Sequence, residues 1–278
     1  MSEFTIQSLL GTPIVSVRDI QCRGTCRARG AEEHTASSHL VFPYRGVYVR
    51  HVGRDEVVAE ANQVLLFSPD EDYRVSHPVA GGDACLSLVV DDAALGELVP
   101  RTLLRPGPAL GFERRRLPIE PRIQAIAAQL RRDLHDDRTS PLEAESRGLA
   151  LIRRALGGRA ARSSGAGAGA GRQRLVDRAK LVVTSDLSRR WTLAEIAAEV
   201  GASPVYLTQL FQQIEGIPLY RYQLRLRLAR ALDLLDRARD LTVLALELGF
   251  SSHSHFTAVF RQTYGVSPSV VRGRLVAH

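Results

Sequence analysis

Residues 242–268 read TVLALELGFSSHSHFTAVFRQTYGVSP, and the spacing within this stretch decides how the C-terminal part of the chain folds. Phe256, Val259 and Phe260 recur at three- and four-residue intervals, which predicts a helix with one apolar face. His253 and His255 are two residues apart, so they point to different faces of that helix and do not hold one metal ion together. The stretch therefore predicts a helix with outward-facing histidines.

An earlier stretch, residues 192–218, repeats this pattern as TLAEIAAEVGASPVYLTQLFQQIEGIP. Each copy predicts a helix, a glycine-containing turn and a second helix that starts at a serine, which together make a helix-turn-helix. The corresponding residues in the two copies are Ile196 and Leu244, Gly201 and Gly249, Leu207 and Phe256, Phe211 and Phe260, Gly216 and Gly265, and Pro218 and Pro268.

The segment between the two copies, residues 218–238, predicts one amphipathic helix that starts at a proline. At 1.5 Å per residue this helix is roughly 30 Å long, close to one turn of B-DNA. If this connecting helix separates the second helices of the two copies by about one turn of DNA, those two helices can enter successive major grooves from the same side of the duplex. In each of them an apolar face packs inward, formed in the first copy by Leu207, Leu210, Phe211 and Ile214.

Residues 172–275 resemble the DNA-binding domain of the AraC-type transcriptional regulators. The resemblance rests on IAAEVGASPVYLTQLFQQIEG (196–216), RLRLARAL (225–232) and LGFSSHSHFTAVFRQTYGVSPSVVR (248–272). It implies an all-α domain with two helix-turn-helix motifs that bind double-stranded promoter DNA, and a contact with RNA polymerase if the protein is an activator.

The family pattern also implies which side chains meet DNA, although each of them can equally be an ordinary solvated residue. The positions facing base edges are Val205, Thr208 and Gln209 in the first copy, with Tyr206 exposed beside them, and His253, Ser254, Thr257 and Ala258 in the second. Gln212, Arg261 and Gln262 fall nearer the DNA backbone. Many family members carry arginine at positions 209 and 258, so the glutamine and alanine here favour A·T steps.

Further arginines are candidates for phosphate contacts or for ion pairs with Glu215, Asp233 or Asp236. They are Arg221, Arg225, Arg227, Arg230, Arg272 and Arg274, of which Arg227 matches a family arginine for which a structural role is an equal alternative. The charge balance supports DNA binding, because residues 172–278 hold 15 Lys and Arg against 9 Asp and Glu while residues 1–156 are nearly neutral. Trp191 is expected in the core, against the first helix-turn-helix.

The N-terminal half predicts a different fold. Short strand-like runs at 47–49, 63–69, 73–77 and 85–90 are separated by turn residues, as in a sandwich or barrel, and amphipathic helices are predicted at 119–134 and 140–156. This order is similar to the cupin-like sensing half of AraC-type regulators. The expected fold is therefore α+β in two domains, 1–157 and 172–278, joined by a flexible Gly/Ala/Ser linker at 158–171.

The three cysteines, Cys22, Cys26 and Cys85, leave three interpretations open. With His77, which the turn at 77–84 brings towards Cys85, they offer the ligands of a zinc site. The alternatives are three ordinary buried thiols or a redox switch. An organic effector is expected inside the barrel near Tyr48, Arg50, Tyr73 or Arg74.

Taken together, the sequence predicts a transcriptional regulator controlled by a small-molecule, metal or redox signal sensed in its N-terminal domain. The alternative is a cupin-type metalloenzyme with an accessory DNA-binding domain, but the iron ligands His-x-His are missing, since His51 stands alone. A purely architectural DNA binder is disfavoured by the large N-terminal half. A cytoplasmic protein without membrane contact is expected, because neither a signal peptide nor an apolar run of about 18 residues is present. The predicted helices of the N-terminal half can cover the barrel or form a homodimer.

Overall fold

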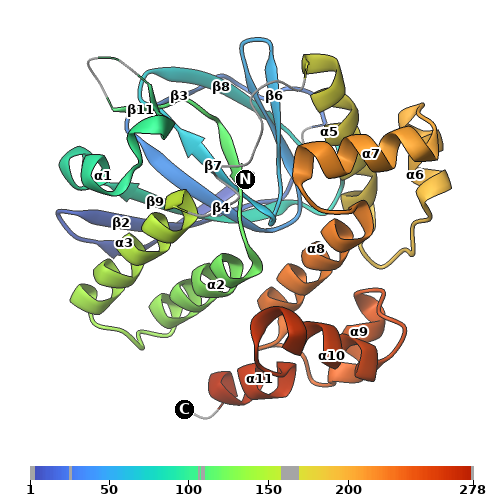
Figure 1. The fold of residues 1–278 in the computed structure, drawn as a ribbon. Coiled ribbons are helices and arrows are strands. Elements are labelled where there is room, and N and C mark those ends of the chain that lie inside the picture. The colour runs from blue at the N-terminus through green and yellow to red at the C-terminus, as the bar shows by residue number, and fades with distance from the viewer. Residues whose placement is uncertain (1–3, 25–26, 106, 108–109, 158–168, 277–278) are drawn as a thin grey trace. The chain divides into compact units, whose positions relative to one another are not determined.

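The computed structural model describes residues 4–24, 27–105, 107, 110–157 and 169–276. The chain divides into two compact units, Met1–Ala170 and Gly171–His278 (Figure 1). Most of the predicted linker, residues 158–168, lies outside the described residues, and its last two residues already belong to helix α5 (Ala170–Ser185).

The first unit is built on antiparallel sheets. Its six-stranded sheet has the order β1 (Phe4–Gly11), β2 (Val15–Cys22), β9 (Asp83–Val90), β4 (His39–Arg45), β7 (Gln63–Phe67) and β12 (Arg116–Pro118). A four-stranded sheet has the order β3 (Glu33–Thr35), β8 (Glu71–Ser76), β5 (Tyr48–Val52) and β6 (Asp55–Ala59). The short strands β10 (Leu104–Arg105) and β11 (Gly111–Phe112) pair with each other. The prediction of a strand-rich N-terminal half is confirmed.

Apolar residues are buried on both faces of the six-stranded sheet. On one face Leu40 and Leu88 pack in the same core as Leu151 of helix α3 (Pro141–Gly157), while on the other face Val41 lies in a second core with Tyr48 and Phe67. Leu40 and Val41 are neighbours in β4, so the strand's alternation sends them to opposite faces. This double burial explains why β9 reads CLSLVV rather than as alternating apolar and polar residues.

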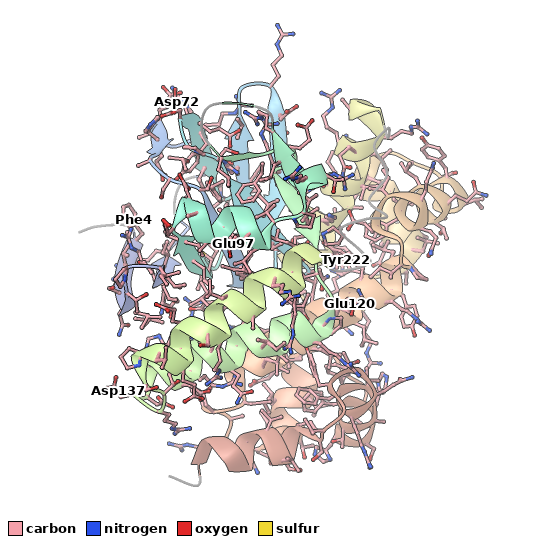
Figure 2. All side chains as sticks on the ribbon, turned by 60° about the vertical axis from the view of Figure 1, so that its left-hand side comes forward. Phe4, Asp72, Glu97, Glu120, Asp137 and Tyr222 are labelled. Atoms are coloured by element: carbon pink, nitrogen blue, oxygen red, sulfur yellow. The ribbon has the colours of Figure 1, made fainter. Side chains whose placement is uncertain are left out.

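Helices cover the first of these faces. α2 (Pro121–His135) and α3 (Pro141–Gly157) lie side by side (Figures 1 and 2), and α1 (Asp92–Leu98) and the 3₁₀ turn η1 (Arg101–Leu103) complete the layer. α2 begins at Pro121, as a proline-initiated helix should. Buried Asp19 of β2 holds the other end of α2, with its carboxylate 2.8 Å from His135 Nε2. The helices predicted at 119–134 and 140–156 are confirmed to within two residues.

The second unit is helical throughout. After α5 come α6 (Leu193–Val200), α7 (Pro204–Glu215), α8 (Leu219–Leu234), α9 (Leu241–Glu247), α10 (His253–Tyr264) and α11 (Pro268–Val276). Among the helices of both units, over the residues that the structure describes, none is long and apolar enough to cross a lipid bilayer.

The helix α8 differs from the predicted 218–238 in length and in character. It ends at Leu234, where the amides of Arg237 and Ala238 turn back to the Leu234 carbonyl, so it spans 16 residues, or about 24 Å. It is also not amphipathic, because buried residues occur around it rather than along one stripe. The buried residues are Leu219, Tyr222, Leu226, Arg227, Leu228, Ala229, Ala231 and Leu232. The reason is that α8 has neighbours on more than one side.

Candidate nucleic-acid interface

The first helix pair, α6 and α7, has its ends fixed by the local sequence. At the start of α6 the Glu195 amide donates to Thr192 Oγ1 and the Thr192 amide donates to Glu195 Oε2, which is a capping box. Hydrogen bonds from Thr192 and Arg189 lower the pKa of Glu195 to about 2. Gly201 ends α6 in the left-handed conformation, and Ser203 caps α7 through the Tyr206 amide.

The second pair, α9 and α10, is built with the same devices. Asp240 caps α9 by accepting from the Thr242 amide, Gly249 turns the chain at φ +79°, and Ser252 caps α10 through the His255 amide. Gly265 ends α10 at φ +81°, as Gly216 ends α7 at +71°. The internal repeat in the sequence therefore corresponds to two similarly capped pairs of helices, α6 with α7 and α9 with α10.

Arg227 on α8 joins the segment before the first pair to the turn inside the second pair. Its guanidinium donates to the carbonyl oxygens of Leu187 at 2.7 Å, Arg189 at 2.8 Å and Gly249 at 3.0 Å. Arg227 is only 8% exposed, so these bonds form in a nearly dry environment, where they are strong. Arg227 is therefore a structural residue rather than a phosphate contact, which decides between the two roles left open by the sequence.

The turn at Gly249 has no room for a side chain. A Cβ built there overlaps the Ser188 carbonyl oxygen and lies 2.8 Å from Arg227 Nη2. Glycine is thus required for two reasons, the positive φ and the close approach of α8.

A buried ion pair holds α5 against the end of α7. Lys180 Nζ lies 2.6 Å from Glu215 Oε1, and both side chains are more than nine-tenths buried. Glu215 therefore pairs with Lys180, not with one of the arginines proposed as its partners. The Phe211 ring meets Tyr222 of α8 edge to face, with 5.1 Å between ring centroids. These contacts fix the inner face of α7, which consists of Leu207, Leu210 and Phe211, with Ile214 half-buried at its edge.

Trp191 differs from its predicted place in the core. It is half-buried at the surface, where Arg189 lies over its ring at 3.9 Å and its Nε1 donates to the Asp186 carbonyl at 3.1 Å. The indole thus closes the loop before α6 instead of packing under the helix pair.

The side chains assigned to DNA lie on the outer faces of α7 and α10. Thr257 is half-buried and the other ten are exposed, with Val205 at 68% and Tyr206 at 45%; the ten are Val205, Tyr206, Thr208, Gln209, Gln212, His253, Ser254, Ala258, Arg261 and Gln262. Gln212 donates to the Gly216 carbonyl, and His253 lies 3.4 Å from the Thr257 hydroxyl. Within the described part of the chain, the side chains of Gln209 and Arg261 make no hydrogen bond or ion pair, and both are exposed to solvent.

The other arginine candidates separate by their contacts. Arg230 is paired with Asp233, and Arg272 lies 3.4 Å from the carbonyls of Ala238 and Arg239. Arg221 is exposed and Arg225 half-buried, both on α8. The side chain of Arg274 lies outside the described residues.

The second unit is similar to helix-turn-helix domains of known proteins. Residues 196–274 match the family model described as "Helix-turn-helix domain". The chain is 35% identical over 94 residues to the regulatory protein PocR of Salmonella typhimurium, covering 34% of this chain and 31% of that protein. It is 31% identical over 104 residues to the transcriptional activator RhaR of Klebsiella pneumoniae, covering 37% of each. The chain thus spans about a third of the length of these curated relatives.

A solved structure shows the same likeness. It is a transcriptional regulator of Chromobacterium violaceum described by its AraC-type DNA-binding domain, with 30% identity and a TM-score of 0.36 over 39% of this chain and 97% of that one. Residues 196–274 thus match a helix-turn-helix domain that also occurs in these transcriptional regulators. We call the second unit the AraC-type domain, after the family that its sequence resembles.

Outside the AraC-type domain, the predicted effector residues are occupied by protein neighbours. Arg50 is fully buried, ion-paired with Glu71, and stacked 3.6 Å from the Phe67 ring centroid. Tyr73 donates to Glu33 Oε2 at 2.7 Å, and Tyr48 is buried in the second apolar core. Arg74 is exposed, because it alternates with Tyr73 along β8 and faces away from that core. An effector reaching Arg50 must therefore compete with Glu71.

The predicted metal ligands are only partly brought together. A ring nitrogen of His77, Cys22 Sγ and a carboxylate oxygen of Asp83 lie within 4.8 Å of one another. Cys85 is not in this group and packs instead in the second apolar core with Val41 and Tyr48. Cys26 lies outside the described residues. Asp83 was missed by sequence reasoning that considered cysteine and histidine alone, although it stands six residues after His77 in the same turn.

Proposed function

We propose that this protein is a sequence-specific, DNA-binding transcriptional regulator whose first unit, a cupin-like pair of sheets with covering helices, senses a signal. The observation that carries the proposal is the outer surface of the AraC-type domain. Two similarly capped helices, α7 and α10, present polar side chains outward while their inner faces are anchored to the core. Amide and imidazole groups at such positions read base edges in the major groove.

The DNA target follows from the same residues. Gln209 offers the bidentate amide that suits adenine, and Ala258 offers a methyl group that suits the thymine methyl, so A·T pairs are expected at those two steps. Arg261 and Arg221 supply charge towards phosphates. We infer no catalytic role, since the curated relatives are regulators and His51, the lone histidine of β5, lies 2.8 Å from Ser76 Oγ.

The fragment 172–278 is expected to select a defined duplex from a random library, because both helix pairs and the joining helix lie within it. Binding should weaken steeply with salt, since several arginines displace counterions from the DNA. The measurement is repeated binding selection followed by titration at several salt concentrations, with the full chain in parallel. A folded fragment that enriches no sequence contradicts the proposal.

Base contacts and phosphate contacts are expected to respond differently to alanine. Gln209→Ala or His253→Ala should cost about 1–3 kcal/mol on the selected site and relax preference at a few adjacent base pairs. Arg261→Ala should weaken selected and unrelated duplexes by similar factors and lower the salt slope by about 1. Exposed Arg237, in the loop before α9, is the matched control for a lost surface arginine. If all three variants change affinity without changing preference, the assignment of readers is wrong.

A further inference from the structure

Cys22, His77 and Asp83 form the one group of potential metal ligands found among the described residues, and it lies in the first unit. Cys22 is the last residue of β2 and Asp83 the first residue of β9, and the two are paired across the antiparallel ladder. His77 directly follows β8, so the group stands where the chain passes from the four-stranded to the six-stranded sheet. An ion held here would therefore connect the two sheets.

The backbone around the group is packed too tightly for side chains. Gly24, Gly46 and Gly82 all have positive φ values, between +63° and +70°. A Cβ on Gly24 would lie 2.7 Å from Gly82 Cα and 3.3 Å from the His77 ring, and a Cβ on Gly82 would overlap the Cys22 carbonyl oxygen. These positions require glycine, and the close backbone packing around them brings Cys22, His77 and Asp83 near one another.

The polar contacts of the three ligands suit an ion. His77 Nε2 and Asp83 Oδ1 are 2.6 Å apart, and both residues are about 95% buried. The Gly24 amide donates to Cys22 Sγ at 3.4 Å, which holds the sulfur beside His77 and Asp83. The group therefore offers a sulfur, an imidazole nitrogen and a carboxylate oxygen, which are the atoms that bind zinc in proteins.

The ligand set selects the kind of metal. Thiolate and imidazole favour zinc over magnesium or calcium, and a single histidine does not make the two-histidine, one-carboxylate set of iron oxygenases. In a tetrahedral zinc shell, ligand atoms are roughly 3.3–3.7 Å apart, so the separations of up to 4.8 Å must shorten by about 1 Å and the 2.6 Å between His77 and Asp83 must lengthen by somewhat less. Cys22, half-buried at a strand end, can make that movement.

We propose that Cys22, His77 and Asp83 bind one zinc ion at the junction of the two sheets. Binding releases the Cys22 thiol proton to solvent, and the ion replaces the hydrogen bond between His77 and Asp83, whose proton leaves to solvent or moves to the other ring nitrogen of His77. Three protein ligands leave the fourth tetrahedral position for water or another small ligand. The site requires no DNA and none of the AraC-type domain, so it stands or falls separately from the proposed function.

Cobalt titration of the full chain, purified without a polyhistidine tag and stripped with chelator, tests this site. One equivalent of Co²⁺ is expected to give the intense visible bands of a tetrahedral ion and a sulfur-to-metal band in the near ultraviolet, and Zn²⁺ should abolish both. Cys22→Ser and Asp83→Asn should weaken binding by more than about 100-fold, beyond the range for residues that only support a ligand. Cys85→Ser, a thiol two residues from Asp83 but outside the group, should bind like the natural chain.

Thermal melting supplies a second readout. Zinc should raise the melting temperature of the natural chain and of Cys85→Ser, but not of Asp83→Asn, because only an ion bound to the folded state stabilises it. Asp83→Asn keeps the shape of the side chain and decides the outcome if Cys22→Ser does not fold. Absence of the cobalt bands, their retention in Cys22→Ser, or their equal loss in Cys85→Ser overturns this ligand set.

Discussion

Gly249→Ala is expected to lower the free energy of unfolding of the AraC-type domain by several kcal/mol. The new methyl group meets the Ser188 carbonyl and the Arg227 guanidinium, and the left-handed backbone at φ +79° adds about 1–2 kcal/mol of strain. Neither neighbour can retreat, since Arg227 is bonded to three carbonyls. The total should exceed about 4 kcal/mol, a large part of the stability of a small domain. Urea unfolding of the fragment 172–278, followed by circular dichroism, measures it.

Gly265→Ala is the matched control for this substitution. Gly265 has nearly the same backbone, φ +81°, but nothing lies within 4 Å of its Cβ position. It should therefore lose only the strain of the left-handed conformation, about 1–2 kcal/mol. Equal losses at the two positions would show that the close approach at Gly249 contributes nothing.

Arg227→Met is expected to cost about 3–5 kcal/mol, because each buried carbonyl left without a donor costs about 1–3 kcal/mol and water recovers part of it. Methionine fills much of the arginine's volume, so the loss reports the hydrogen bonds to Leu187, Arg189 and Gly249 rather than a cavity. Arg227→Lys keeps the charge but cannot reach all three oxygens, and it should fall in between.

Arg221→Met controls for the loss of an arginine from the same helix. Arg221 is exposed near the start of α8, and its replacement should change the free energy of unfolding by less than about 0.5 kcal/mol. For DNA affinity the order of the two variants should be reversed. When affinities are corrected for the fraction of unfolded protein, Arg221→Met should weaken binding at moderate salt more than Arg227→Met does. If Arg227→Met unfolds like Arg221→Met, the three carbonyls are not held as described.

The helices of the AraC-type domain were largely predictable because the residues that start and end them act on neighbouring backbone groups. Caps such as Ser203 and Ser252 and terminators such as Gly216 and Gly265 set helix ends within a few residues of themselves, and the structure places the ends there. The end of α8 and the place of Trp191 were not predictable in this way. α8 ends in a local turn at the Leu234 carbonyl, and Trp191 is held by the neighbouring Arg189 and Asp186; hydrophobic periodicity records neither kind of contact.

The metal ligands show the same limit within a sheet. The sequence spacing predicted Cys22, Cys26 and Cys85 alike as metal ligands. In the structure, the register of β2 and β9 places Cys22 opposite Asp83 and Ile20 opposite Cys85. Register comes from pairing between strands about 60 residues apart in the chain, and a shift of one residue moves every side chain to the other face. The same alternation separated Tyr73 from Arg74 among the effector candidates.

The Arg227 junction has a consequence for engineering new DNA specificity. Its three hydrogen bonds reach the segment before α6 and the turn after α9, so neither helix pair can be replaced independently of the other. A chimera that receives another protein's second half must also receive a glycine at position 249 and carbonyls in register with this guanidinium. Retargeting is better attempted by redesigning the outer side chains of α7 and α10 in place, because among the described residues the three Arg227 bonds go to Leu187, Arg189 and Gly249 and to none of those positions.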